Sequence, residues 1–378
     1  MTDAARPAFS ATDHRHMALA LRLAERGLWT TQPNPRVGCV IAQGDDVVGS
    51  GWHRRAGEAH AEVFALTEAG ERARGATVYV TLEPCGLHGR TPPCADALVA
   101  AGVARVVVAS EDVDQSDGDA MQRLRAAGIV VESGLMREPA RELNRGFFHR
   151  VERGRPWLRV KLAISLDART ALSDGTSKWI SGEAARADVQ RWRARSSALL
   201  TGSGTLRADD PQLTVRIPDV EGARPLFVPP LRVVLDTGLA TPAGAKVIDG
   251  SAPTLVLHAP NARRAAHFDK VECVPVEMRG SHLDLDAVLG LLATRGCNEV
   301  QVEAGATLAG AWLTAGLVDE LLLYVAPVLL GDDARPLLYL PPLTTMAGRY
   351  ELRTIERRAV GDDLRLLLRP APDGARPP

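Results

Sequence analysis

The chain has 378 residues, of which 46% are hydrophobic, 24% charged and 4% aromatic. This is the composition of an ordinary globular protein, and the length exceeds one typical core, so we expect two domains. The 45 basic and 46 acidic side chains leave no electrostatic footprint of a nucleic-acid or anionic-membrane binder. We therefore expect a small-molecule partner and no nucleic acid.

The apolar segments are too short to cross a membrane. None approaches the roughly 18 residues of a spanning helix, because residues such as Arg105, Arg159 and Pro327 interrupt them. The first residues also lack the basic and apolar stretches of an export signal. These patterns predict no membrane association and a cytoplasmic location.

The first 150 residues alternate between helical and strand patterns. A helix is expected from Asp13, capped by Asp13 or Thr12, because apolar residues repeat behind it at helical spacing. Alternating residues at 36–42 and 46–52, separated by a Gly-Asp-Asp turn, predict a hairpin. Further helices are expected at 59–70, 92–102 and 121–128, and strands at 76–82, 104–110 and 129–132. Such alternation is typical of a sheet covered by helices.

The composition changes near residue 150, where a helix predicted at 137–150 runs into a polar segment. We therefore predict domains at 1–150 and 151–378. The second domain has the pattern of another α/β domain, with a helix at 183–196. Its strands are expected at 156–166, 196–202, 231–236, 253–258, 298–305, 319–330, 350–358 and 363–370.

Five cysteines are too few for a disulfide framework in a chain of this length. Cys39, Cys273 and Cys297 lie in or beside strand-like segments and are interpreted as small buried side chains. Cys85 and Cys94 instead lie in a turn rich in Pro and Gly, where a thiol has no core to fill. These two thiols therefore need a chemical explanation.

His60 supplies that explanation together with the two thiols. One imidazole and two thiolates suit zinc, and three protein ligands leave the fourth position of a catalytic site for water. Glu62, two residues after His60 in the first turn of a predicted helix, can move a proton at that water without being a ligand. By itself, a His-x-Glu motif on a helix is usually a surface pair, and a Cys after a strand is usually a core residue. Together they indicate a hydrolytic zinc deaminase, with eight residues between the cysteines where the general motif has two.

A family resemblance then becomes specific. The strings PNPRVGCVI at 33–41, AGEAHAEV at 56–63 and TLEPCGLHGRTPPC at 81–94 resemble the bifunctional riboflavin-biosynthesis pyrimidine deaminase/reductases. The resemblance continues at 161–171, 177–181, 205–216 and 302–313 and so covers nearly the whole chain. It implies an α/β protein with an N-terminal cytidine-deaminase-like three-layer domain and a C-terminal dihydrofolate-reductase-like domain.

The resemblance implies that the first domain deaminates 2,5-diamino-6-(5-phosphoribosylamino)pyrimidin-4(3H)-one. His60, Cys85 and Cys94 would bind Zn2+, and Glu62 would deliver the proton that lets ammonia leave. Asn34 is a candidate for positioning the ring, although an Asn between prolines is as often a turn residue. The family usually has a polar residue, often His, where this chain has Gly86 and Leu87, while His88 is retained.

The second domain has no G-x-G-x-x-G opening a helix after a strand. It has glycines after a strand at Gly202 and Gly204, and at Gly305 and Gly310 where a strand passes into a helix. Amides at a helix start can hold a phosphate, but such glycines are also ordinary turn residues. Lys161 and Lys178 are two of only four lysines, in a chain that otherwise uses arginine, so a compact ammonium group is either needed there or accidental.

The resemblance implies that this domain uses NADPH to reduce the ribosyl group to ribityl, with Lys161 as an electrostatic or proton-handling partner. Arg193 and Arg216 suit the 5′-phosphate because guanidinium groups form forked hydrogen bonds. Ala168 replaces a glycine that is common in this motif. The implied cofactor residues are Ala163, Trp179, Thr205, Asp209, Thr237, Gly305, Ala306, Thr307, Leu308, Ala309, Gly310 and Ala311. The implied substrate residues are Ser177, Arg193, Leu213, Arg216 and Glu303.

Two other functions stay open on the residues alone. One is a nucleoside, base or RNA deaminase joined to a non-catalytic domain, and RNA binding should bring a basic, aromatic face that the composition lacks. The other makes the second half a phosphosugar-binding module without redox activity. Cofactor binding separates these from the bifunctional enzyme, and a homo-oligomer is compatible with each.

Overall fold

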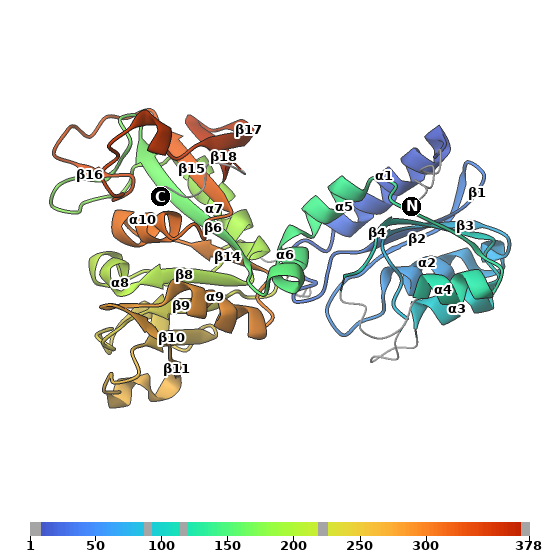
Figure 1. Cartoon of the computed structure of the whole chain (residues 1–378), viewed down its shortest axis with the longest axis horizontal. Helices are drawn as coiled ribbons and strands as arrows, with labels where there is room; N and C mark the ends of the chain where they lie inside the picture. The colour runs from blue at the N-terminus through green and yellow to red at the C-terminus, as the bar shows by residue number, and fades with distance from the viewer. Residues whose placement is uncertain (1–8, 87–92, 114–119, 218–225, 372–378) are drawn as a thin grey trace. The chain divides into compact units, whose positions relative to one another are not determined.

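The computed structural model describes residues 9–86, 93–113, 120–217 and 226–371 (Figure 1). The chain divides into two compact units, Met1–Arg153 and Gly154–Pro378. Each unit contains its own sheet and its own apolar core. The division falls at the end of a helix, three residues beyond the boundary expected from composition.

The first unit is built on a five-stranded mixed sheet of order β2-β1-β3-β4-β5. Its β1/β2 hairpin is antiparallel, as predicted, whereas β3, β4 and β5 run parallel. The alternation of strands and helices therefore gives a layered sheet. The strands are β1 (Gly38–Gln43), β2 (Asp46–Trp52), β3 (Thr77–Leu82), β4 (Arg105–Ser110) and β5 (Val130–Ser133).

Helices cover both faces of this sheet and make three layers (Figure 1). One face packs against the apolar sides of α2 (Ala61–Ala69), α3 (Cys94–Ala101) and α4 (Ala120–Ala126). The other face packs against α1 (Ala11–Glu25) and α5 (Arg137–Leu143). The strands between these layers are apolar on both sides, which explains their continuous hydrophobic runs.

Two strand glycines let helices approach the sheet closely. A Cβ atom at Gly38 would lie 2.0 Å from the carbonyl oxygen of Ala20, and one at Gly51 would lie 2.3 Å from that of Ala61. A side chain at either position would push a helix away from the sheet. Gly51 thereby fixes the first turn of α2, the turn that carries His60 and Glu62.

Two local predictions need correction. The N-cap of α1 is Ser10, whose hydroxyl oxygen accepts from the Asp13 amide while the Asp13 carboxylate accepts from Ser10, so Asp13 closes a capping box instead of opening the helix. The helix expected at 137–150 is two helices, α5 and α6 (Arg145–Arg153), that break at Asn144. The side-chain amide of Asn144 forms two hydrogen bonds of 2.8 Å with the backbone of Arg36, and this tertiary contact fixes the break between the helices.

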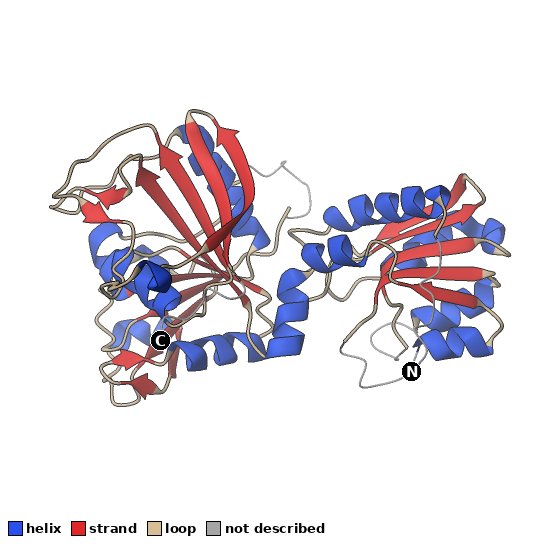
Figure 2. Cartoon of the chain, turned by 45° about the horizontal axis from the view of Figure 1, so that its top comes forward, coloured by secondary structure: helices blue, strands red, loops and turns tan. Residues whose placement is uncertain are grey.

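The second unit is built on a nine-stranded sheet of order β11-β10-β9-β8-β14-β6-β15-β18-β17. Strands from β11 to β15 pair in parallel, and β18 and β17 are added antiparallel at one edge (Figure 2). The bounds are β6 (Trp157–Ser165), β8 (Ala198–Gly202), β9 (Leu231–Leu235), β10 (Thr254–His258), β11 (Glu272–Pro275), β14 (Glu299–Val302), β15 (Glu320–Ala326), β17 (Leu352–Val360) and β18 (Asp363–Pro370).

Helices again lie on both faces of the sheet. The larger core packs one face against α9 (Leu285–Thr294) and α10 (Ala306–Thr314). The other face packs against α7 (Glu183–Arg195) and α8 (Ser203–Asp209), and it also carries charged residues. Arg159 on β6 is fully buried there and bonds to Glu299 and Glu320 at 2.8 and 2.7 Å, so the charges that interrupt these strands are paired.

Short elements complete the two units. They are η1 (Gly70–Ala73), β7 (Arg169–Ala171), η2 (Lys246–Ile248), η3 (Ala266–Lys270), β12 (Met278–Arg279), β13 (His282–Leu283), β16 (Arg335–Pro336) and η4 (Met346–Gly348). Within the described ranges, no helix combines the length and the apolar character that a membrane span requires.

Candidate active sites

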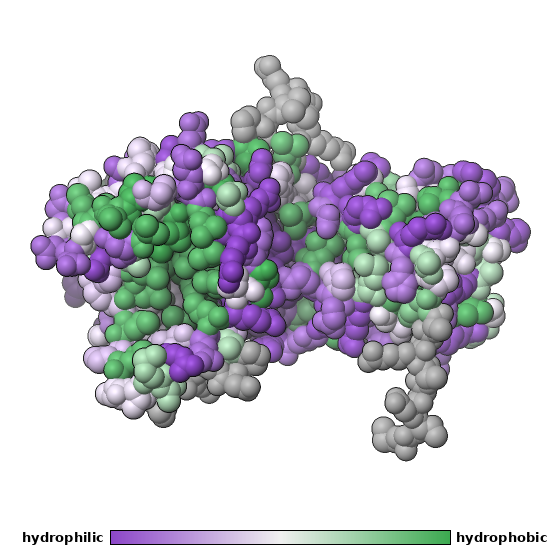
Figure 3. Space-filling view, turned by 90° about the horizontal axis from the view of Figure 1, so that it is seen from above, coloured by the Kyte–Doolittle hydropathy of each residue, from purple (hydrophilic) through white to green (hydrophobic). Residues whose placement is uncertain are grey.

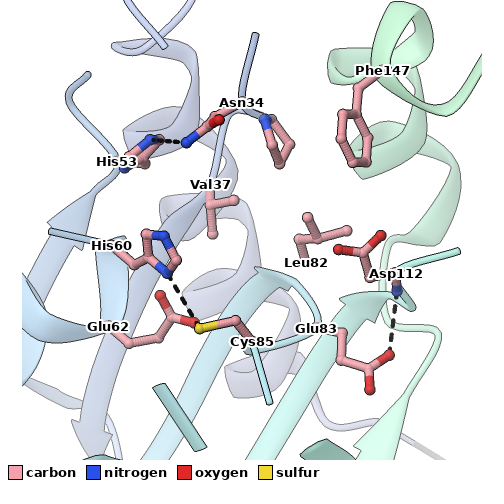
Figure 4. Close-up of a pocket in the computed structure, with 11 residues that line it drawn as sticks. Asn34, Val37, His53, His60, Glu62, Leu82, Glu83, Cys85, Asp112 and Phe147 are labelled. Carbon is pink, nitrogen blue, oxygen red and sulfur yellow. Dashed lines mark hydrogen bonds between the residues drawn. The ribbon is translucent and has the colours of Figure 1, made fainter. Parts of the chain in front are cut away.

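The first unit contains a cavity of about 210 Å³ beside the ends of β3 and β4 (Figure 4). Its wall combines apolar side chains with titratable groups, as is typical of a small-molecule site. Both His60 and Glu62 line it, Asn34 and His53 lie next to His60, and Phe147 and Asp112 lie on the other side (Figure 4). The lining residues are Asn34, Pro35, Val37, His53, His60, Glu62, Leu82, Glu83, Cys85, Asp112 and Phe147.

The three predicted zinc ligands converge beside this cavity. His60, Cys85 and Cys94 place one ligand atom each within 4.8 Å of the other two. The Nδ1 atom of His60 is 3.2 Å from the Cys94 sulfur and 3.4 Å from the Cys85 sulfur. One imidazole nitrogen and two sulfurs at this spacing fit a tetrahedral zinc ion with one position left over.

Local structure explains the convergence. His60 is the N-cap of α2 and Cys94 is the first residue of α3, so two helix starts point toward one place. Cys85 follows β3, and its sulfur accepts a hydrogen bond of 3.3 Å from the Cys94 amide. A backbone amide that donates to a ligand sulfur orients it and favours the thiolate.

Hydrogen bonds among His60, Cys85 and Cys94 shift the pKa values of all three side chains. Hydrogen bonding with Cys94, and then with His60, lowers the pKa of Cys85 to about 4. The same contact with Cys85 raises the pKa of Cys94, and hydrogen bonding with Cys85 raises the pKa of His60. The donor set therefore already stabilises one thiolate beside an imidazole, which suits a divalent cation.

Glu62 has the position expected of a proton carrier. Its side chain is only 2% exposed, and burial raises its pKa to about 7. Its Oε2 atom is buried and forms no hydrogen bond within the described part of the chain. A buried carboxyl oxygen without a partner, directed at a cavity with metal ligands, fits a group that exchanges a proton with a bound molecule.

His53 is a site residue that sequence analysis missed. Its Nδ1 atom is 3.1 Å from the Ala59 carbonyl oxygen, so Nδ1 carries the proton and donates. Its Nε2 atom must then accept from the Asn34 amide nitrogen at 3.1 Å, which fixes the orientation of that amide (Figure 4). The Asn34 side-chain oxygen has no hydrogen-bond donor among the described residues, so it can accept a hydrogen bond from a ligand. A lone His after a predicted strand gave no signal of this role.

The motif around Gly86 is only partly described. Gly86 is half-buried next to Cys85. Leu87 and His88, the other positions singled out there, lie outside the described residues.

The second unit contains a larger cavity, of about 1580 Å³. This volume exceeds that of a typical site for one drug-sized ligand and allows a dinucleotide together with a second substrate. Most of the residues that the resemblance implied line it. They are Lys161, Ala163, Ser177, Trp179, Arg193, Thr205, Asp209, Leu213, Arg216, Thr237, Glu303, Gly305, Ala306, Thr307, Leu308 and Ala311.

The start of α10 suits a phosphate group of a dinucleotide. Its N-cap is Gly305, and no side chain caps the free amides of its first turn. These amides open on the cavity next to the turn at Gly202 and Gly204. Uncapped amides at a helix N-terminus bind anions, so the observed wall fits NADPH although the sequence lacks a Rossmann fingerprint.

Two of the implied cofactor residues do not line this cavity. Ala309 is fully buried in the larger core. Gly310 faces a neighbouring segment, because a Cβ atom there would lie 2.1 Å from the Tyr339 carbonyl oxygen. Gly310 thus allows α10 to pack closely against the segment at Tyr339, whereas Gly305 is the N-cap of α10.

Arg193 is held by Glu303. Its Nε and Nη2 atoms donate to the Glu303 carboxylate at 2.7 and 2.8 Å, and Nη1 donates to the Thr214 carbonyl oxygen at 2.9 Å. Burial by itself would raise the pKa of Glu303, but Arg193 and then Lys161 lower it to about 2. Gln301 adds a third hydrogen bond to the carboxylate at 3.0 Å. Glu303 is therefore an ionised acceptor, and most of the Arg193 fork is engaged.

The remaining substrate and catalytic candidates differ in accessibility. Trp179 is 72% exposed, whereas the Leu213 side chain is buried in an apolar cluster. Burial lowers the pKa of Lys161, an effect that Glu303 opposes. Ala168, where the family has glycine, has a left-handed φ of 58°. This turn therefore keeps a backbone conformation that glycine adopts more easily than alanine.

Fold and sites together define a zinc-dependent deaminase joined to a reductase. Two family models match the chain: the cytidine and deoxycytidylate deaminase zinc-binding region over residues 10–110, and the RibD C-terminal domain over residues 156–366. The Escherichia coli riboflavin biosynthesis protein RibD is 48% identical over 94% of this chain and 99% of its own.

Solved structures agree over the whole length. Form 1 of Acinetobacter baumannii RibD is 43% identical, covers 95% of this chain and 99% of its own, and has a TM-score of 0.88. A Thermotoga maritima diaminohydroxyphosphoribosylaminopyrimidine deaminase/5-amino-6-(5-phosphoribosylamino)uracil reductase, 28% identical, has a TM-score of 0.84 over 95% of this chain and 99% of its own. The chain belongs to the RibD family of bifunctional deaminase/reductases of riboflavin biosynthesis, which use zinc and NADPH. A nucleoside or RNA deaminase fused to a non-redox module is not favoured.

Proposed function

We propose that the deaminase activity belongs to residues 1–150 and acts on 2,5-diamino-6-(5-phosphoribosylamino)pyrimidin-4(3H)-one. The convergence of His60, Cys85 and Cys94 around one point, with Glu62 beside it, carries this proposal. The chemistry named for the Thermotoga maritima relative supplies the substrate. Water replaces the 2-amino group, and ammonia leaves.

His60, Cys85 and Cys94 hold zinc, and zinc supplies the Lewis acidity that makes water a nucleophile near neutral pH. Glu62 takes a proton from the attacking water and passes it to the departing amine, because its carboxyl group lines the cavity beside the three ligands and its Oε2 atom has no hydrogen-bond partner among the described residues. Asn34, with its amide oriented by His53, accepts a hydrogen bond from an N–H group of the pyrimidine.

We further propose that residues 151–378 carry the reductase activity. When bound, NADPH would supply the hydride needed to reduce the first carbon of the ribosyl group in its open-chain form. The α10 amides and the residues around Thr205 and Thr237 bind the cofactor, with Trp179 at the cavity wall. Glu303 accepts hydrogen bonds from the substrate, and Ser177 and Arg216 bind its 5′-phosphate. The Lys161 ammonium group, close to Glu303, stabilises the negative charge that develops on the ribosyl group as the hydride is added.

A coupled assay tests both activities. With NADPH present, absorbance at the nicotinamide band should fall when the deaminated phosphoribosylaminouracil is added to the zinc-depleted enzyme. The diamino substrate should cause a fall only when zinc is present. Unchanged absorbance with the deaminated substrate would contradict the proposed reductase activity. Full zinc occupancy of the Cys85→Ser variant by elemental analysis would contradict the assignment of Cys85 as a zinc ligand.

We also propose that the protein acts on this small molecule in the cytoplasm as a homo-oligomer, without nucleic acid. Large apolar side chains are exposed on the second unit, and its surface shows extended apolar areas (Figure 3). Leu166, Val328 and Leu329 lie together, since the Leu166 amide donates to the Val328 carbonyl oxygen. Contiguous apolar surface of this kind favours a protein interface. Light scattering that gave the mass of one chain at micromolar concentration would contradict the oligomer.

A further inference from the structure

The segment 210–217 forms neither helix nor strand, yet it carries five residues of the larger cavity: Asp210, Pro211, Gln212, Leu213 and Arg216. Its backbone includes left-handed residues, with φ of 41° at Asp210 and 52° at Leu213. Such conformations persist only where the surrounding structure holds them. Because no backbone ladder fixes this segment, side chains from elsewhere must do so.

Three long polar side chains hold its main chain. Arg232, fully buried on β9, donates from Nη1 to the Gln212 carbonyl oxygen at 3.2 Å. Arg193 donates to the Thr214 carbonyl oxygen. Gln190 accepts from the Arg216 amide through Oε1 at 2.9 Å. Because Gln190 and Arg193 lie three residues apart on α7, one face of this helix holds both ends of the Thr214–Arg216 stretch.

Arg216 is one of the residues that line the larger cavity. Within the described ranges its guanidinium group makes no hydrogen bond and no ion pair, although it lines the cavity. Burial and the charge of Arg193 lower the pKa of Arg216, whereas Glu303, which is paired with Arg193, opposes this effect. An arginine in this situation is suited to an anionic group of a bound molecule.

We infer that Gln190 is a positioning residue, which directs Arg216 at the phosphate of the reductase substrate by fixing the Arg216 backbone amide. The inference rests on the proposed role of Arg216 and assigns Gln190, which lines the same cavity, a role that acts through the Arg216 backbone. Gln190 is 8% exposed, so its amide cannot exchange this hydrogen bond freely for water. Loss of the Gln190 side-chain oxygen leaves the Arg216 backbone N–H without its acceptor and lets Arg216 move.

The test compares two substrates in the full-length enzyme: the phosphoribosylaminouracil and its dephosphorylated counterpart. The readout is the ratio of their kcat/KM values, which measures the contribution of the phosphate. Arg216→Met should lower this ratio by about tenfold to a hundredfold, as expected for a charge-assisted hydrogen bond. Gln190→Met, similar in volume but without the acceptor, should lower it by about tenfold through KM.

Controls separate positioning from general damage. Gln212 also lines the cavity, but its side chain does not bond to Arg216 and makes contacts of 3.4 Å with Asp249 and Thr214. Gln212→Met therefore tests whether loss of any amide from this wall lowers the ratio, and it should leave the ratio unchanged. Gln190→Asn keeps a buried amide that is too short to reach, so it should reproduce Gln190→Met even if that variant folds poorly. Deamination and the KM for NADPH should be unchanged in both Gln190 variants.

The outcomes distinguish the two ideas. If Arg216→Met leaves the ratio unchanged, the phosphate does not lie at Arg216 and the proposed function fails there. If Arg216→Met lowers the ratio but the Gln190 variants do not, Gln190 has no positioning role. An equal loss of kcat/KM for both substrates in the Gln190 variants would show a general structural role and would also overturn the inference.

Discussion

Glu62 combines three properties that suit a proton carrier: burial, a carboxyl oxygen with no hydrogen-bond partner in the described part of the chain, and proximity to the predicted zinc ligands. The sequence predicted its position, because His60 and Glu62 share the first turn of one helix. His53 was missed because its role depends on contacts with Ala59 and Asn34, which only the folded chain brings together. A residue that acts through another residue leaves no local pattern.

Glu62→Gln should abolish deamination while zinc remains bound. The amide keeps the volume but cannot carry a proton, so ammonia release should fall by at least about a hundredfold. Ammonia release is measured with the diamino substrate, and zinc by elemental analysis. The NADPH-dependent reaction of the same sample serves as the control, and normal ammonia release would remove Glu62 from the mechanism.

Ala168→Gly should stabilise the second unit. Ala168 has a left-handed φ of 58°, which costs an L-residue with a Cβ about 1 kcal/mol, and glycine should recover part of this cost despite its larger entropy loss. Denaturant unfolding followed by loss of reductase activity should give a higher midpoint. Ala168→Val, with a β-branched side chain at the same φ, should lower the midpoint, and equal midpoints for all three proteins would contradict the account.

At the scale of elements, helix starts decide the chemistry of both units. The starts of α2 and α3 carry predicted zinc ligands, and the start of α10, which no side chain caps among the described residues, borders the larger cavity. Sequence patterns located these helices well, because alternating strands and amphipathic helices have distinct periods. They failed at Asn144 and Ser10, where a tertiary hydrogen bond and a capping box, respectively, decide the ends.

Gly310→Ala should displace α10 and weaken NADPH binding. The new methyl group would meet the Tyr339 carbonyl oxygen at 2.1 Å, and overpacking of this kind costs about 1–3 kcal/mol of unfolding free energy. Gly290→Ala is the matched control, since nothing lies within 4 Å of a Cβ there and Ala should stabilise α9 by about 0.5–1 kcal/mol. Fluorescence titration with NADPH and denaturant unfolding measure the two effects. Equal stability of the two variants would show that α10 tolerates the shift.

At the scale of the whole molecule, two compact units have separate cores and separate cavities. The lining residues of one cavity all belong to the first unit and those of the other to the second. Chemical independence of the two activities is therefore expected, because neither site borrows a described residue from the other unit.

Removal of zinc should separate the two activities. A chelator should stop ammonia release, since the ligand set loses its Lewis acid, while NADPH oxidation with the deaminated substrate should continue at an unchanged rate. Both rates are followed in one sample, and added zinc should restore the first. A parallel fall in NADPH oxidation would mean that the second unit depends on the metal.

The amino-acid sequence by itself predicted the two-domain α/β organisation, the family resemblance, and a set of zinc ligands with a neighbouring carboxylate, because periodicity and short motifs are local properties of the chain. The tertiary structure decided that Arg193 bonds to Glu303, that Gly310 serves packing, and that His53 and Gln190 orient their neighbours. These roles arise from contacts between residues distant in the chain, whose hydrogen-bond partners exist only once the sheets and helices have assembled.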